Sequence, residues 1–306
     1  MPVLRCRDRT IDVRRPLVMG VVNATPDSFS DGGDLRSADE AVARARALVD
    51  DGAEVIDIGG QSAITGVPEI SVPEEIDRVL PVVAGVRAAS NCMISVDTYR
   101  AAVAAAVLDA GADVINDVSG VIDPDMPDLV ARTGAGLVVM HTRWRPKTRT
   151  DARALYQDVE GGVVADVVER LRTRRDELLD AGVASEQLIL DPGPDFSKTA
   201  AQTVAVLRSL DAVTALGRPL LLALSRKDFV GVITGRPPRE RLAGTLAALA
   251  FACTRAPASI VRVHDVAQVR DFFAVLDVLE ARAEVDEQSG LAANLRWDAR
   301  VAPAST

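Results

Sequence analysis

Val18-Met-Gly-Val-Val-Asn-Ala-Thr-Pro-Asp-Ser-Phe-Ser-Asp-Gly-Gly33 is the stretch that decides the fold. A short apolar run, Leu17–Val22, leads directly into Asn23 and then into a loop rich in hydroxyl and carboxylate side chains. Buried parallel strands read as continuous apolar runs, and the loops at their C-terminal ends carry functional groups. The stretch therefore predicts a buried parallel strand that delivers a site at its C-terminal end.

The same pattern recurs along the whole chain, because apolar β-branched runs alternate with amphipathic helical patterns. The predicted strands are 17–22, 55–58, 93–96, 114–115, 136–140, 188–190, 220–223 and 260–263. The predicted helices are 38–51, 73–90, 100–110, 162–181, 199–210, 239–254 and 269–281. Eight such units predict an α/β fold, a closed (β/α)8 TIM barrel. An open doubly wound sheet would show a Gly-rich fingerprint after the first strand, and Asn23-Ala-Thr-Pro26 is not one.

The two ends of the chain lie outside this alternation. Residues before Pro16 alternate between apolar and polar, which predicts a β-hairpin over the floor of the barrel. We expect a single barrel domain over residues 1–283, followed by a polar tail over residues 284–306 with Trp297 as its one candidate anchor.

Composition narrows the classes of function. A net charge of −9 argues against a general nucleic-acid binder, although a few local cations could still hold a small anion. The three cysteines are scattered and show no pairing or metal spacing, so we expect reduced, buried thiols. No signal-peptide or membrane-spanning pattern is present, and we expect a cytoplasmic protein.

Polar side chains follow all eight predicted strands. In a barrel these positions converge on one mouth, where the loops after the strands build the active site. Both histidines of the chain belong to this set. Its members are Asn23, Asp57, Gln61, Ser62, Asp97, Thr98, Asn116, Asp117, His141, Asp191, Ser225, Arg226, Lys227, Arg262 and His264.

Two groups within this set suggest a ligand. Asp97, Asn116 and Asp191 offer oxygens to a row of planar N–H donors such as the edge of a pterin or guanine, and Lys227 could donate to a ring carbonyl. The alternative to a ligand-binding role is a structural one, in which Asp97 and Asn116 form a hydrogen-bonded plug in the barrel core.

The second group is rich in hydrogen-bond donors. Arg262, His264, Asn23 and Ser62 suit a phosphate or pyrophosphate, and Asn23 carries a neutral oxygen appropriate to Mg²⁺ bound through a substrate phosphate.

At this point the motifs resemble those of the dihydropteroate synthases, in the family's order over residues 17 to 280. The opening stretch resembles the family's MGxxNxTPDSFSDGG motif. The agreement continues through Asp57-Ile-Gly-Gly60, Ile94-Ser-Val-Asp-Thr-Tyr-Arg100, Ile115-Asn-Asp-Val-Ser-Gly120, Met140-His141, Leu190-Asp-Pro-Gly193, Ser225-Arg-Lys227 and Val261-Arg-Val-His264.

The resemblance implies a folate-biosynthesis transferase that condenses 6-hydroxymethyl-7,8-dihydropterin pyrophosphate with 4-aminobenzoate. It implies a pterin pocket of Asp97, Asn116, Asp191 and Lys227, and a pyrophosphate and Mg²⁺ site of Asn23, Ser62, Arg262 and His264. Asp27 would stabilise a pterin carbocation, and the catalytic set would be Asp27, Lys227, Arg262 and His264. Phe196 and Ser225 would lie on the aminobenzoate side, and a homodimer would form through the late helices.

The chain departs from its family in the loops. Ala63 and Ile64 replace a Thr and an Arg, and losing such an Arg hydrogen bond costs roughly 1.5–3 kcal/mol. Asp195 and Asp228 replace a Gly and a Ser, which we expect to add carboxylates near a pocket for a benzoate.

These departures leave several readings open. The chain could be a working synthase in which Arg143, Arg145 or Lys147 replaces the missing Arg, or a paralogue that binds pterin but uses another amine or none. Other reaction classes are a methyltetrahydrofolate-binding methyltransferase domain, which needs neither Ser225-Arg-Lys227 nor Arg262 with His264, and a Schiff-base aldolase using Lys227.

Overall fold

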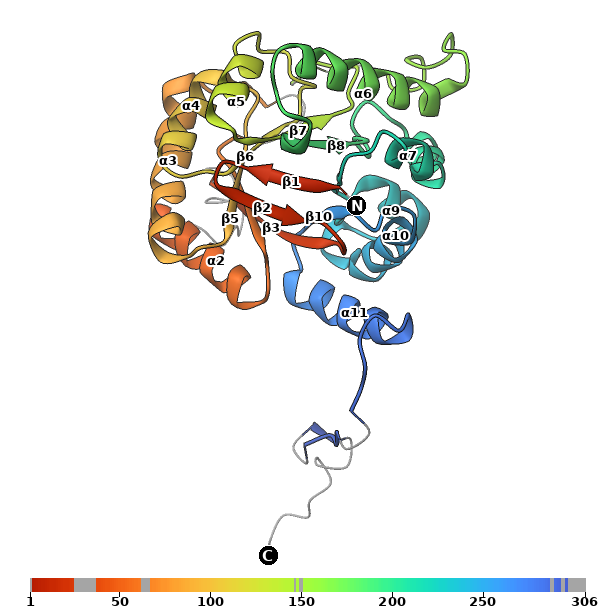
Figure 1. Cartoon of the computed structure of the whole chain (residues 1–306). Helices are drawn as coiled ribbons and strands as arrows, with labels where there is room; N and C mark the ends of the chain where they lie inside the picture. Colours follow the sequence, from red (N-terminus) through yellow and green to blue (C-terminus); the bar gives the residue numbers. More distant parts are fainter. Residues whose placement is uncertain are drawn as a thin grey trace, which may run out of the picture.

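A closed barrel of eight parallel strands forms the centre of the protein (Figure 1). The computed structural model describes residues 2–24, 37–61, 67–145, 147–148, 151–286, 289–292 and 295–296. The strand order is β10-β3-β4-β5-β6-β7-β8-β9, which confirms the predicted barrel. The strands are β3 (Leu17–Asn23), β4 (Val55–Gly59), β5 (Met93–Asp97), β6 (Val114–Asp117), β7 (Gly136–Met140), β8 (Leu188–Asp191), β9 (Leu220–Leu222) and β10 (Ser259–Val263).

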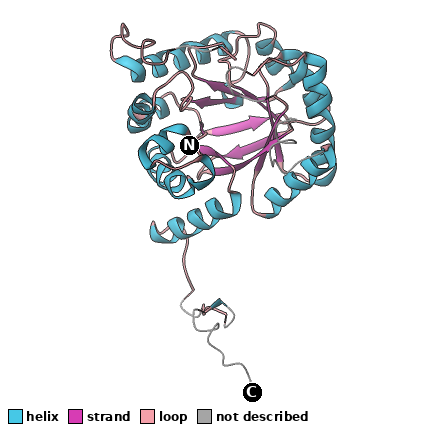
Figure 2. Ribbon diagram, turned by 180° about the vertical axis from the view of Figure 1, so that it is seen from behind, coloured by secondary structure: helices cyan, strands magenta, loops and turns pink. Residues whose placement is uncertain are grey.

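Helices surround the strands on all sides, as the view from behind shows (Figure 2). Ser37 and Ser71 cap α2 and α3, because each hydroxyl accepts a hydrogen bond from the backbone N–H three residues further along the chain. The helices are α2 (Ala38–Asp50), α3 (Val72–Ala89), α4 (Ala101–Asp109), α5 (Met126–Thr133), α6 (Gly162–Asp180), α7 (Ala200–Arg208), α8 (Leu210–Thr214), α9 (Asp228–Thr234), α10 (Leu242–Arg255) and α11 (Val266–Leu279).

The predicted hairpin, β1 (Val3–Cys6) and β2 (Arg9–Asp12), lies across the N-terminal end of the barrel (Figure 1). Leu4 and Cys6 are at most 1% exposed. They pack in one cluster with the first residues of the barrel strands, such as Val55, Met93 and Val114. The hairpin therefore closes the barrel floor, as expected.

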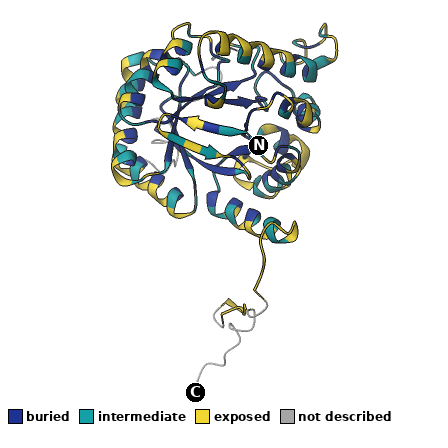
Figure 3. Cartoon of the chain, viewed as in Figure 1, coloured by how far each residue is buried: buried dark blue, intermediate teal, exposed yellow. Residues whose placement is uncertain are grey.

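Side-chain alternation decides which polar groups reach the barrel interior. Along β4, Ile56 and Ile58 belong to the apolar layer between strands and helices, whereas Val55 belongs to the floor cluster. Successive residues of a strand point to opposite faces, so Asp57 faces inward. Figure 3 shows the buried strands inside and the exposed outer faces of the helices.

A few elements differ from the prediction. The predicted helix 199–210 is divided at Ser209 into α7 and α8, and the short helices α5 and α9 were not predicted. After α11 the chain runs away from the barrel (Figure 1), and Trp297 lies outside the described residues. Among the described helices, none combines the length and the apolar character needed to cross a membrane.

Candidate functional site

The C-terminal ends of the strands form one rim. In the parallel register Asn23 pairs with Gly59, Gly59 with Asp97, and Asp97 with Asn116. Asp191 ends β8, two strands further round the barrel. The structure therefore brings Asn23, Asp97 and Asn116 together at one end of the consecutive strands β3 to β6, as the sequence predicted.

Asp57 is the hydrogen-bonding centre of this mouth. Its fully buried carboxylate accepts from Arg262 Nε at 2.6 Å, Ser95 Oγ at 2.7 Å and Asn116 Nδ2 at 3.3 Å. Arg262 Nη2 also lies 3.7 Å from the Asp97 carboxylate. Such charge-assisted contacts hold the guanidinium in one orientation. The sequence analysis gave Asp57 no role, although a carboxylate inside an apolar strand was a usable signal.

The predicted pterin residues keep unused hydrogen-bond acceptors. The buried Oδ1 of Asn116 has no partner among the described residues, and Asp191 accepts one bond, from Gly193 N–H at 2.7 Å. Burial, followed by the charge of Asp57, raises the pKa of Asp97 to about 7, and burial raises the pKa of Asp191 to about 6. Since an unmatched buried acceptor costs roughly 1–3 kcal/mol, these oxygens are suited to ligand N–H groups.

Lys227 and Phe196 share one wall of the mouth. Lys227 Nζ lies 4.3 Å from the centroid of the Phe196 ring, within cation–π range. Burial lowers the pKa of Lys227, and the charges of Asp195 and Asp191 oppose that shift. The two residues that the sequence assigned to the pterin carbonyl and the arylamine therefore lie in contact.

His264 presents one ring nitrogen to the mouth. Its backbone N–H donates to Ser225 Oγ at 3.3 Å, which leaves the Ser225 hydroxyl hydrogen to donate to Nδ1 at 3.0 Å. Burial, together with the charges of Arg262 and Arg226, lowers the pKa of His264 to about 4. The ring is therefore neutral at pH 7 and carries its hydrogen on Nε2. Ser225 thus contacts His264, which the sequence analysis assigned to pyrophosphate, whereas it assigned Ser225 to the aminobenzoate side.

The two additional carboxylates each have a partner in the fold. Asp228 is 86% exposed and pairs with Arg241 at 2.9 Å, and its charge still acts on the pKa of Lys227. Asp195 accepts from the Thr203 hydroxyl at 3.0 Å and from the Phe229 N–H at 3.1 Å. Asp195 therefore ties the loop after β8 to α7 and α9.

His141 is the clearest error of the sequence analysis, which placed it in the mouth. Its ring lies on the outer side of β7, where Nε2 contacts Asp166 of α6 at 2.9 Å and Nδ1 contacts Lys198 Nζ at 2.8 Å. The side chain is fully buried there. His141 belongs to the layer between barrel and helices.

The three cations proposed to replace the missing Arg have different surroundings. Arg143 is held by Asp166, with Nη2 at 2.7 Å. Lys147 is half-buried. It lies in a turn that is closed by a hydrogen bond from Thr148 N–H to Arg145 O at 3.2 Å. Burial lowers the pKa of Lys147, and the opposing charges include Glu69 and Asp97 of the mouth side. Lys147 is therefore the best placed of the three.

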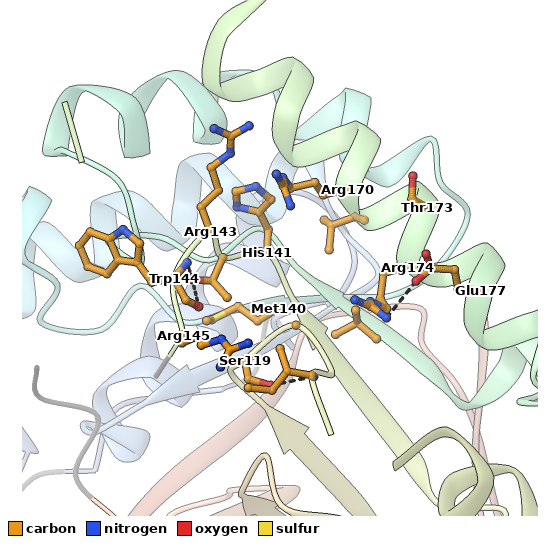
Figure 4. Close-up of a pocket in the computed structure, with 15 residues that line it drawn as sticks. Ser119, Met140, His141, Arg143, Trp144, Arg145, Arg170, Thr173, Arg174 and Glu177 are labelled. Atoms are coloured by element: carbon orange, nitrogen blue, oxygen red, sulfur yellow. Dashed lines mark hydrogen bonds and ion pairs between the residues drawn. The ribbon is translucent and has the colours of Figure 1, made fainter. Parts of the chain in front are cut away.

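Arg145 lines a separate cavity of about 370 Å³ between α6 and the loops after β6 and β7. Figure 4 shows Arg145, Arg170 and Arg174 around this space, with Glu177 paired to Arg174. The cavity contains none of the predicted pterin or pyrophosphate residues, so it is distinct from the mouth.

Several predicted residues lie outside the described residues. They are Asp27, Ser62, Ala63 and Ile64. For a metal, the described residues contain no cluster of three or more His, Cys, Asp or Glu side chains. Asn23 is exposed at the end of β3 and offers one amide oxygen at the rim. This donor suits Mg²⁺, which keeps several waters and binds largely through substrate phosphates.

Comparison with known proteins finds similar sequences and similar structures. The family of pterin binding enzymes matches residues 19–264. A dihydropteroate synthase from Synechocystis sp. is 41% identical over 271 residues, which are 87% of this chain and 91% of that protein.

Solved structures agree with this match. The Xanthomonas albilineans dihydropteroate synthase with 4-aminobenzoic acid superposes with a TM-score of 0.83 and 39% identity, covering 92% of this chain and 98% of that one. The same enzyme in complex with 7,8-dihydropteroate gives a TM-score of 0.79 at 39% identity, covering 92% and 99% of the two chains.

Proposed function

The chain belongs to the pterin binding enzymes and, within them, to the dihydropteroate synthase family, and we propose that it catalyses that family's reaction. It is a transferase of folate biosynthesis. It condenses 6-hydroxymethyl-7,8-dihydropterin pyrophosphate with 4-aminobenzoate and releases 7,8-dihydropteroate and pyrophosphate.

The observation that carries this proposal is that one mouth holds both hydrogen-bond acceptors without a full set of partners and hydrogen-bond donors held in one orientation. Asn116 Oδ1 is buried without a partner among the described residues, and Asp97 and Asp191 lie on the same rim. Arg262 and His264 supply the donors a diphosphate needs. A flat heterocycle with a diphosphate arm satisfies both groups at once.

The reaction breaks the bond between the pterin methylene carbon and the diphosphate oxygen. Both electrons of that bond leave with pyrophosphate, which Arg262 and the Nε2–H of His264 stabilise. Positive charge develops on the methylene, and Asp27 is proposed to stabilise it. The lone pair of the arylamine forms the new C–N bond, and the amine proton passes to solvent.

Asn23 and Ser62 complete the proposed pyrophosphate site. Asn23 would hold Mg²⁺ through its amide oxygen, and bound Mg²⁺ would neutralise negative charge on the leaving diphosphate.

The arylamine needs positioning more than activation. The Phe196 ring offers a flat apolar surface, and Lys227 Nζ lies directly over it. Lys147 is proposed to supply part of the charge that the family takes from the Arg replaced by Ile64.

The alternatives receive less support. A methyltransferase domain has no use for Arg262 and His264 at the rim, and a Schiff-base aldolase would be excluded by failure of borohydride to trap a substrate on Lys227. The third alternative is a paralogue that binds pterin but is inactive with 4-aminobenzoate. The test below distinguishes this paralogue from a working synthase.

We further propose a homodimer in the cytoplasm. The late helices expose large apolar side chains, namely Val232, Ile233, Phe251, Val275 and Leu279. Apolar patches of this kind are typical of subunit interfaces. The three cysteines are free thiols, as a reducing compartment allows.

The test is release of pyrophosphate by the purified chain given pterin pyrophosphate, Mg²⁺ and 4-aminobenzoate. We expect pyrophosphate and 7,8-dihydropteroate in equal amounts, and no release when the arylamine is omitted. Pterin binding without turnover would contradict the proposed reaction and identify the paralogue.

A further inference from the structure

The loop after β8, residues 192–199, has an unfavourable backbone. Gly193, Asp195 and Ser197 have φ values of 63°, 64° and 55°. Residues with a Cβ adopt this left-handed conformation only when their surroundings hold them in it. The loop carries Phe196, so whatever holds the loop also places that ring.

Lys198 is the buried cation that holds this loop. It is 6% exposed, and its ammonium group donates to Gly193 O at 2.9 Å, Phe196 O at 3.0 Å and His141 Nδ1 at 2.8 Å, while His141 O lies 3.4 Å away as a fourth acceptor. An ammonium group has three hydrogens and no acceptor. The three shorter contacts therefore use its full capacity, and two of them are to carbonyls of the loop itself.

His141 and Asp166 fix the third contact. Burial, followed by the charge of Lys198, lowers the pKa of His141 to about 4, so the ring is neutral. Its Nε2–H donates to Asp166 at 2.9 Å, which leaves Nδ1 as the acceptor that Lys198 needs. Arg143 Nη2 and Arg170 Nε also donate to Asp166, at 2.7 and 3.2 Å, and hold the carboxylate in place.

Gly193 shows how closely the loop is drawn onto β7. A Cβ at this position would lie 2.2 Å from His141 O and 3.2 Å from Lys198 Nζ. No side chain fits between the loop and this anchor.

We propose that Lys198 is a positioning residue for the arylamine, which sets the face of Phe196 by holding the two loop carbonyls against His141. This inference rests on the proposed function, because Phe196 matters as a wall of the arylamine site. Lys198 touches neither reactant and acts through the loop.

The pH dependence follows from the same contacts. Burial lowers the pKa of Lys198 to about 7; Asp191 of β8, Asp166 of α6 and Asp195 of the loop oppose the shift, and Lys227 adds to it. His141, which directly follows β7, is neutral. The neutral amine has two hydrogens for the four acceptors around it, so the anchor weakens as pH rises through 7. KM for 4-aminobenzoate should therefore rise between pH 6.5 and pH 8.5.

The test compares Lys198→Met with Arg218→Met. Arg218 is a matched control, because it is a buried cation that donates to backbone carbonyls, Leu188 O and Val3 O, at the floor end of β8. At pH 6.5 we expect Lys198→Met to raise KM for 4-aminobenzoate at least tenfold and KM for pterin pyrophosphate less than threefold. Arg218→Met should leave both within twofold, and the alkaline rise of the wild type should vanish in Lys198→Met.

Hydrogen exchange of peptide 192–200 gives a second readout that needs no turnover. We expect at least tenfold faster exchange in Lys198→Met, and an intermediate rate in Lys198→Gln if the first variant does not fold. Unchanged exchange, or equal changes in both KM values, overturns the inference. A wild type that releases no pyrophosphate refutes the proposed function instead, and the exchange data still decide whether Lys198 holds the loop.

Discussion

The two histidines of the chain follow two strands of the same barrel and have opposite uses. Burial and nearby cations lower the pKa of both His264 and His141 to about 4, so both rings are neutral. His264 uses one ring nitrogen, with Ser225. His141 uses both, with Asp166 and Lys198, and its side chain is fully buried.

The difference is one of unused hydrogen-bonding capacity. In the mouth, Asn116 Oδ1 lacks a partner among the described residues, and Asp191 has room for further donors. In the cluster around His141, Asp166 accepts from His141, Arg143 and Arg170. Polar groups with unused hydrogen-bonding capacity indicate a place for a ligand, whereas polar groups whose capacity is fully used stabilise the fold. Mutations in the first region should therefore act on activity directly, whereas mutations in the second should act through the fold and the loop that it holds.

The largest expected effect is on Arg262 in the mouth. Arg262→Met removes the donor held by Asp57 and should lower kcat/KM by about a thousandfold, roughly 4 kcal/mol of transition-state stabilisation. Steady-state pyrophosphate release measures it. Arg87→Met is the control, because Arg87 pairs with Asp113, directly before β6 at the floor end of the barrel. A loss below tenfold would contradict the role given to Arg262.

The matching experiment in the second region is Asp166→Ala. Burial acts to raise the pKa of Asp166, but hydrogen bonds from His141 and Arg143 outweigh it and hold the pKa well below its usual range. A lowered carboxylate pKa contributes stability above the unfolded pKa, and that stability is lost as pH falls. Urea denaturation at pH 7 should show a free energy of unfolding lower by about 3 kcal/mol. The deficit should shrink toward acid pH, and a deficit that is constant with pH would refute the ionic account.

A smaller effect concerns the pH dependence of pterin binding. The pKa of Asp97 is about 7 and that of Asp191 about 6, and ligand N–H donors favour the ionised carboxylates. Affinity should therefore rise with pH, and Kd should fall about tenfold between pH 6 and pH 8 before levelling off. Calorimetry with unphosphorylated 6-hydroxymethylpterin avoids titration of the diphosphate. Asp97→Asn should flatten the upper part of this profile, and an unchanged profile would exclude Asp97 as its source.

The smallest effect lies at the edge between the two regions. Lys147→Met should raise KM for 4-aminobenzoate about fivefold, roughly 1 kcal/mol, because a partly exposed cation near the mouth is screened by solvent. Arg145→Met is the matched control from the same turn and should have no such effect, since Arg145 lines the separate cavity. Equal effects of the two variants would mean that Lys147 does not replace the missing Arg.

Much of the barrel could be predicted because buried parallel strands leave a plain trace in the sequence. The strand 136–140 was predicted with the bounds that β7 has, and others gained one or two polar residues at their C-terminal ends, such as Asn23 and Asp97. The short helix α9 was missed because its seven residues are too few to show a helical period.

The site was harder to predict, since a strand end does not reveal which way a side chain points. Asn116 faces the mouth, but Asp117 accepts from Ser119 N–H at 2.7 Å and from Val121 N–H at 3.2 Å in its own turn. The direction of the Asp228 side chain was hard to predict for the same reason, because its partner Arg241 lies thirteen positions away in the sequence. Pairing over such distances is decided by packing, which local pattern does not contain.

The sealed floor has a kinetic consequence. Because the hairpin closes one end of the barrel with Leu4 and Cys6, the reactants and products must share a single entrance. The acceptors Asn116 and Asp191 are each 2% exposed, and Phe196 lies nearer to solvent. The bicyclic reactant must then enter before the arylamine, and the joined product must depart before another turnover begins. Compulsory-order kinetics, with the arylamine as second substrate, is the expected result.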